Sequence, residues 1–141
     1  MKYWDSSALV PIVVKEAFSQ RLIKLLADDL VVVTWWGSEV ECASAIARLE
    51  RENKMANAAV AEAFNRLDQF QKGWHQIQPS ASLKPTAKTL LRLHDLRAAD
   101  ALQLAAAIAA SEQQPHTLEF VCLDERLAHA AEKQGFSVIR T

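Results

Sequence analysis

Cysteine is scarce in this chain, and its scarcity excludes one way of stabilising a small protein. The 141 residues contain only Cys42 and Cys122, too few for the disulfide framework of a small secreted domain. Cys42 lies in a helical pattern, whereas Cys122 lies in an apolar strand pattern. We therefore expect two reduced thiols and a cytoplasmic protein.

Long apolar runs and an excess of one charge are also missing. No segment approaches the roughly 20 apolar residues of a membrane-spanning helix, and Asp5 interrupts the apolar N-terminal segment, which no small-residue cleavage site follows. We therefore expect no membrane association. The 16 basic residues nearly balance the 17 acidic ones, so the molecule lacks the strong positive field of many nucleic-acid binders. Any nucleic-acid site must be a local patch.

The composition that remains is typical of one globular domain. Half of the residues are hydrophobic and 23% are charged, and a chain of this length buries a core without disulfide or metal staples. We find no internal repeat or flexible linker, and the only biased tract is an alanine-rich helix near Ala105. One domain over residues 1–141 is the prediction.

Short strand patterns alternate with helix patterns along the chain. The predicted strands cover residues 2–5, 30–34, 75–78, 119–123 and 137–139. The predicted helices cover residues 8–15, 19–27, 37–52, 57–71, 86–94, 98–111 and 124–134, with Ser6 and Ser7 as candidate caps of the first. This alternation predicts an α/β fold with a short central, mostly parallel sheet and helices on both faces.

Four acidic residues fall where such a sheet forms its sites, beyond the carboxyl ends of the strands. Asp5 and Asp124 follow predicted strands, whereas Glu41 and Asp100 lie near the starts of predicted helices. An acid at a helix start is often only a cap, and an acid on a helix is often only solvated. Four convergent carboxylates, however, repel one another unless a cation neutralises them. The set therefore predicts a site for a divalent cation.

The segments that carry these acids are YWDSSALV, EVECASAIARL, LRAADALQLAAA and VCLDERLAHAAEKQGFSV. In this order, and over essentially the whole chain, they resemble the PIN-domain VapC toxins of bacterial toxin–antitoxin pairs. The resemblance implies a PIN-like fold and a metal-dependent endoribonuclease with an acidic quartet of Asp5, Glu41, Asp100 and Asp124. It also implies an RNA substrate cut to 5′-phosphate and 3′-hydroxyl ends, a VapB-like antitoxin and a homodimer.

Some positions leave the quartet ambiguous. Glu39 lies two residues before Glu41, which we choose because E-x-x-x-A-I-A-R fits there. Glu125 directly follows Asp124 and is a rival for the fourth ligand. Gln103 occupies a place where many relatives carry histidine.

Oxygen ligands suit hard cations, so Mg²⁺ or Mn²⁺ is the expected cofactor. We assign the three aspartates as the principal ligands and Glu41 as a direct or water-mediated ligand that also orients the attacking water. Ser6 or Ser7 is expected to assist metal or phosphate binding. Arg48 and Arg51 share a helix face with Glu41 and are weaker candidates for holding RNA phosphates.

Tryptophan and histidine add little to this interpretation. Trp4, Trp35 and Trp36 lie in or after strand patterns, where burial is expected, which makes Trp74 the freest candidate for stacking on a base. The four histidines are dispersed and show no zinc-binding spacing such as H-E-x-x-H.

Two alternative functions stay open. Asp5 after the first strand is also where an aspartyl-nucleophile phosphatase places its nucleophile, but such families have a second acid two residues on, where this chain has Ser7. A non-catalytic or housekeeping PIN-type module that binds or processes RNA is the other alternative. The presence of all four acids favours an enzyme.

Overall fold

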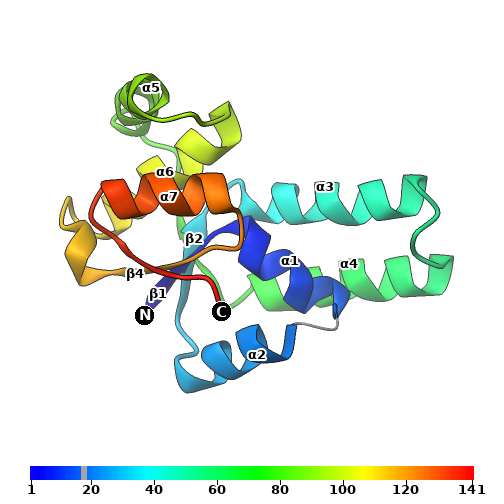
Figure 1. The fold of residues 1–141 in the computed structure, drawn as a ribbon. Helices are drawn as coiled ribbons and strands as arrows, with labels where there is room; N and C mark the ends of the chain where they lie inside the picture. The colour runs from blue at the N-terminus through cyan, green and yellow to red at the C-terminus, as the bar shows by residue number, and fades with distance from the viewer. Residues whose placement is uncertain (17–18) are drawn as a thin grey trace.

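One parallel sheet forms the centre of the molecule (Figure 1). The computed structural model describes residues 1–16 and 19–141. Within them the strands are β1 (Lys2–Trp4), β2 (Val32–Trp35), β3 (His75–Ile77), β4 (Glu119–Val121) and β5 (Ser137–Ile139). Their order is β3-β2-β1-β4-β5, and every neighbouring pair is parallel. The predicted α/β fold with a parallel sheet is confirmed.

The strand order creates a switch point between β1 and β4. From β1 at the centre, the chain adds β2 and β3 on one side, and then returns to add β4 and β5 on the other. Trp4 at the end of β1 pairs with Val121 at the end of β4. Ligand sites in open α/β sheets form beyond the carboxyl ends of the strands at such a switch point. The residues that follow Trp4 and Val121 therefore lie where a site is expected.

Helices cover both faces of the sheet (Figure 1). They are α1 (Ser6–Val14), α2 (Ser19–Asp28), α3 (Ser38–Arg51), α4 (Asn57–Gln71), α5 (Leu83–Leu93), α6 (Ala98–Ala110) and α7 (Glu125–Lys133), with a 3₁₀ turn at Pro115–Thr117. The face that presents Trp4 packs against α1 to α4, whereas the face that presents Tyr3 and Phe120 packs against α5 to α7. Tyr3 and Trp4 point to opposite faces because side chains alternate along a strand. No helix of the described residues is long and apolar enough to cross a membrane.

Most element boundaries differ from the predicted ones by one to three residues, and two of these differences have a clear physical reason. Helix α5 begins at Leu83 rather than at Thr86, because Pro85 fits the first turn, where its missing N–H costs no helical hydrogen bond. Helix α1 is capped by Asp5, whose carboxylate accepts a hydrogen bond from the Ser7 N–H, and not by either serine. Asp5 is therefore the single residue that connects β1 to α1.

Gly37 allows β2 to lead directly into α3. A Cβ atom at this position would lie 2.5 Å from Nε1 of Trp35, closer than real Cβ contacts permit. Any other residue would push aside either the indole or the start of α3. Because the first turn of α3 carries Glu39 and Glu41, the close approach at Gly37 influences where these two acids lie.

Trp36 and Trp74 do not have the environments that their sequence context predicts. Trp74 is only 8% exposed and packs edge-on against Phe70, with ring centroids 5.3 Å apart, so the prediction that it is the freest tryptophan is wrong. Trp36 is 51% exposed, so its predicted burial is wrong as well. The reason is that the chain leaves β2 at Trp35, whereas Trp74 joins the core directly before β3.

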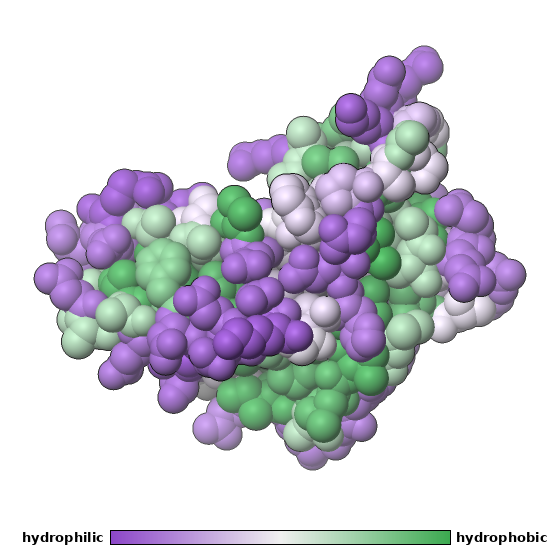
Figure 2. Space-filling view, turned by 180° about the vertical axis from the view of Figure 1, so that it is seen from behind, coloured by the Kyte–Doolittle hydropathy of each residue, from purple (hydrophilic) through white to green (hydrophobic). Residues whose placement is uncertain are grey.

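An apolar area lies on the surface at the end of the molecule that holds α2, and it is green at the lower end of Figure 2. The exposed large apolar residues of α2 and the segment after it are Ile23, Leu30 and Val31. Leu30 and Val31 precede β2. They therefore lie at the edge of the sheet opposite to the carboxyl ends of the strands.

Candidate functional site

A pocket of about 480 Å³ opens beyond the carboxyl ends of β1 and β4, at the switch point of the sheet. All four predicted acids line it, each from a different segment: Asp5 from the end of β1, Glu41 from α3, Asp100 from α6 and Asp124 from the start of α7. We call this site the acidic pocket. The structure thus brings together four carboxylates that are up to 119 residues apart in the sequence.

Asp5 is the most deeply buried acid of the pocket, with 3% of its surface exposed. Its backbone N–H donates to the Val121 carbonyl at 3.0 Å, which extends the pairing of β1 with β4 to this residue. Its Oδ2 accepts the Ser7 N–H at 3.0 Å. The capping role and the position in the pocket coexist, since the cap uses only one of the two carboxylate oxygens.

Glu41 lies in the first turn of α3 and is half-buried. Its Oε1 accepts from the Ser6 hydroxyl at 3.1 Å, and its Oε2 accepts from the Gln103 amide at 2.9 Å. Both oxygens are therefore oriented by side chains from other elements. Glu39, the alternative acid, does not line the acidic pocket.

Asp100 and Asp124 both cap helices while they line the pocket. Asp100 accepts the Arg97 N–H through Oδ2 at 3.4 Å, and Asp124 accepts the Leu127 N–H through Oδ1 at 3.1 Å. Both acids therefore do act as helix caps, but capping occupies only one oxygen of each carboxylate. In each, the second carboxylate oxygen accepts no hydrogen bond from the described residues and remains available to a ligand.

Burial and mutual proximity disfavour the charged forms of Asp5, Glu41 and Asp100. Burial, with a smaller contribution from the charge of Asp100, raises the pKa of Asp5 to about 6. Burial, followed by the charge of Asp5, raises the pKa of Glu41 to about 7. Burial and then the charge of Asp124 raise the pKa of Asp100. No lysine, arginine or histidine of the described residues forms an ion pair with any of the four acids.

The donor set of the acidic pocket fits a hard divalent cation. In the described part of the chain, no three Asp, Glu, His or Cys side chains are grouped closely enough to surround a metal ion by themselves. Mg²⁺ does not need such a cage, because it keeps several waters and binds protein through one or two carboxylates. The all-oxygen set is unlike a zinc site. The free oxygens of Asp5, Asp100 and Asp124, together with Glu41, are the groups that would hold the ion.

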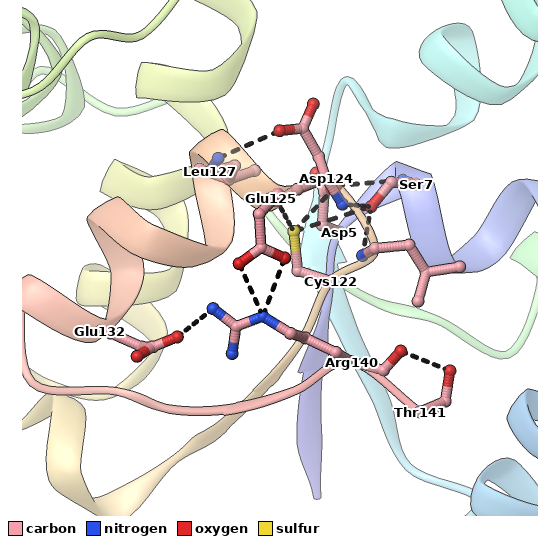
Figure 3. A network of polar contacts seen from close by, with 10 residues as sticks. Asp5, Ser7, Cys122, Asp124, Glu125, Leu127, Glu132, Arg140 and Thr141 are labelled. Atoms are coloured by element: carbon pink, nitrogen blue, oxygen red, sulfur yellow. Dashed lines mark hydrogen bonds and ion pairs between the residues drawn. The ribbon is translucent and has the colours of Figure 1, made fainter.

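The two serines have different positions in the pocket, although both line it. Ser6 donates to Glu41. The hydroxyl oxygen of Ser7 accepts the N–H groups of Leu123 at 2.9 Å and Asp124 at 3.3 Å (Figure 3). Ser7 therefore holds the segment between β4 and α7 against the start of α1, whereas Ser6 acts on an acid.

Of the two candidate arginines, only Arg48 lines the acidic pocket. It lies one turn of α3 beyond Ser44, which also lines the pocket. Arg51 lies in the last turn of α3 and is exposed. Of the two arginines that were expected to share a helix face with Glu41, Arg48 therefore lies near the acids and Arg51 does not.

Glu125 points away from the other acids and is engaged elsewhere. Its carboxylate accepts from Nε of Arg140 at 3.0 Å, and Arg140 also pairs with Glu132 (Figure 3). The hydrogen bond from Arg140 lowers the pKa of Glu125. Glu125 does not line the acidic pocket, which leaves Asp124 as the acid that this segment contributes.

Three further residues border the site although they are not among its predicted members. Glu16 lines the acidic pocket. Gln103 is fully buried and donates to Glu41. The buried Cys122 thiol lies 3.7 Å from Oδ2 of Asp5, and burial, followed by the charge of Asp5, raises its pKa well above the usual range. Cys122 and Cys42 are both free, as expected.

Comparison with known proteins adds no assignment. No protein-family model matches the chain, and no curated protein matches its sequence significantly. Because one fold supports many unrelated activities, the function has to be inferred from the residues of the acidic pocket.

The raised pKa values predict that the metal-free protein is more stable at about pH 5.5 than at about pH 8. The folded-state pKa of Glu41, about 7, exceeds the roughly 4.3 of an unfolded glutamate, so the folded state binds the proton more tightly. The stabilisation is complete below the unfolded value and is lost as the pH rises through about 7. Asp5 acts in the same direction. Thermal unfolding in EDTA as a function of pH measures the effect.

Glu41→Gln is the control for this pH dependence, because the amide cannot ionise. His94, whose pKa is lowered by burial, acts in the opposite direction in both proteins and cancels in the comparison. The variant should gain less stability on acidification than the wild type. Equal gains in the two proteins would show that Glu41 does not carry the effect.

Proposed function

We propose that this chain is a Mg²⁺- or Mn²⁺-dependent endoribonuclease of the PIN-domain kind. The observation that carries the proposal is the convergence of four carboxylates, from four separate segments, in one pocket without a cationic partner among the described residues. Caps alone do not require convergence, whereas a divalent cation does favour it. The order of the four sequence motifs supports the same family.

Each residue of the pocket has a separate role in the proposed phosphodiester hydrolysis. A bound divalent cation would activate water and stabilise charge on the phosphoryl oxygens. The three aspartates would hold the ion, in part through its bound waters, and Glu41 would orient the attacking water or accept its proton. Arg48, which lines the pocket, would hold an RNA phosphate. The expected products carry a 5′-phosphate and a 3′-hydroxyl.

The biological role that we propose is that of a cytoplasmic toxin controlled by a VapB-like antitoxin. The motif order over the whole sequence supports this role, and with it a homodimer. A housekeeping nuclease that processes RNA would use the same chemistry. Growth of cells that express the chain separates the two roles, as described in the Discussion.

Removal of the metal is the direct test of the chemistry. Purified protein, freed of any bound antitoxin, is expected to cleave cellular RNA with Mg²⁺ or Mn²⁺, and to lose this activity in excess EDTA. Cleavage should return when Mn²⁺ is added beyond the chelator. Full activity in EDTA would contradict the proposal, and RNA binding without cleavage under any of these conditions would favour a non-catalytic module.

A further inference from the structure

A chain of buried hydrogen bonds connects the acidic pocket to the interior of the protein. It joins five side chains. Four of them are fully buried, namely Tyr3 on β1, Thr34 on β2, Ser38 on α3 and Gln103 on α6. The fifth, Glu41 on α3, is half-buried. These residues come from four elements and are separated by up to 100 positions. We call this set the buried polar chain.

Gln103 is the centre of the buried polar chain. Its Oε1 accepts from the Tyr3 hydroxyl at 2.6 Å. Its Nε2 donates to Ser38 Oγ and to Glu41 Oε2, both at 2.9 Å. The amide therefore uses both of its N–H groups and its oxygen, which leaves no spare donor.

The direction of every hydrogen bond in the chain is determined. Thr34 donates its single hydroxyl proton to the Trp4 carbonyl at 2.7 Å, so the Ser38 hydroxyl must donate to Thr34, at 2.6 Å. Ser38 is then free to accept from Gln103. If the amide were turned over, its oxygen would face the Glu41 carboxylate, and two acceptors would oppose each other at hydrogen-bond distance. Only one orientation of Gln103 satisfies the chain.

One end of the chain lies in the acidic pocket, and the other end lies next to an acid of the pocket. One end is the Glu41 carboxylate itself. The other end is the carbonyl of Trp4, the residue directly before Asp5. The network therefore binds Glu41 directly and binds the backbone of the residue that precedes Asp5. Among the described residues, the buried side-chain polar atoms without a partner are the indole N–H groups of Trp4 and Trp74, and none belongs to the chain.

We propose that Gln103 is a positioning residue for the metal site: held by Tyr3 and Ser38, its amide orients the Glu41 carboxylate toward the ion. The inference rests on the proposed metal-dependent function. Gln103 contacts Glu41 and is 0% exposed, so it acts through that acid and not on RNA. Loss of a group that orients a metal ligand in this way typically weakens metal binding or activity about 10- to 100-fold.

The test is Mn²⁺ binding measured by calorimetry in the intact protein. Gln103→Met keeps an unbranched side chain but removes the amide, and we expect it to weaken Mn²⁺ binding about 10- to 100-fold. Tyr3→Phe removes only the hydroxyl and keeps the ring stacked on Phe120, so it should weaken binding in the same direction by less. Ile46→Val, a buried change on the same helix without polar contacts, should leave Mn²⁺ affinity unchanged.

A double-mutant cycle with Glu41→Gln separates positioning from general damage to the fold. If Gln103 acts through Glu41, adding Gln103→Met to Glu41→Gln should change Mn²⁺ affinity by less than about twofold. In RNA cleavage, Gln103→Met should lower kcat and leave KM unchanged. These results would support the proposal.

Three results would overturn it. The first is that both Gln103→Met and Tyr3→Phe bind Mn²⁺ as tightly as the wild type. If Gln103→Met does not fold, wild-type affinity in Tyr3→Phe is sufficient to overturn the proposal. The second is an equal loss of affinity with and without Glu41. In either case, metal-dependent RNA cleavage by the wild type would still support the proposed function. The third is a wild-type protein that neither binds Mn²⁺ nor cleaves RNA, which defeats the proposed function together with this inference.

Discussion

Asp5→Asn is expected to abolish RNA cleavage, and cells that express it should escape the growth arrest that we expect from the wild-type chain expressed alone. Asparagine caps helices as well as aspartate does, so the hydrogen bond from the Ser7 N–H should persist and the fold should remain. What is lost is the charge of the most deeply buried acid of the pocket. We expect cleavage to fall at least about a hundredfold, since a metal site supplies several kcal/mol to the transition state and each 1.4 kcal/mol is tenfold in rate.

Two measurements check this prediction, the initial rate of RNA cleavage with Mn²⁺ and the growth of cells after induction. Asp68→Asn is a matched control, because Asp68 is exposed on α4 and does not line the pocket. It should cleave RNA and arrest growth like the wild type. A neighbouring small open reading frame should relieve the arrest if the chain is a toxin. Normal growth at demonstrable soluble expression of the wild type would count against that role, but not against the chemistry.

Asp100→Asn is expected to move activity and metal-free stability in opposite directions. Asparagine can still accept the Arg97 N–H that Asp100 accepts at 3.4 Å. The substitution removes one of the charges that disfavour each other in the pocket. The melting temperature in EDTA should therefore stay unchanged or rise. Mn²⁺ binding should weaken, and most of the cleavage should be lost.

The capping interpretation predicts a different result for Asp100→Asn. If Asp100 only capped α6, the variant would change the free energy of unfolding by a few tenths of a kcal/mol and cleave RNA at the wild-type rate. Melting in EDTA, the melting shift on adding Mn²⁺, and the cleavage rate distinguish the two. Normal cleavage with an undiminished Mn²⁺ shift would remove Asp100 from the site.

The positions of the acids in the sequence were enough to predict that they meet. Asp5 and Asp124 each follow a strand, and parallel strands end at one edge, so their convergence follows once the sheet is parallel. Gln103 shows where this reasoning stops. On an alanine-rich helix it has no local signal, and its partners Tyr3, Ser38 and Glu41 lie between 62 and 100 residues away.

The sequence by itself determined the α/β class, the parallel sheet and the order of the elements, because these follow from local periodicities of two and 3.6 residues. Only the tertiary structure decided which side chains share an environment. It paired Glu125 with Arg140, exposed Trp36, buried Trp74, and closed the buried polar chain around Gln103. The reason is that such contacts join residues far apart in the chain, and they depend on strand order and helix packing, which no local pattern encodes.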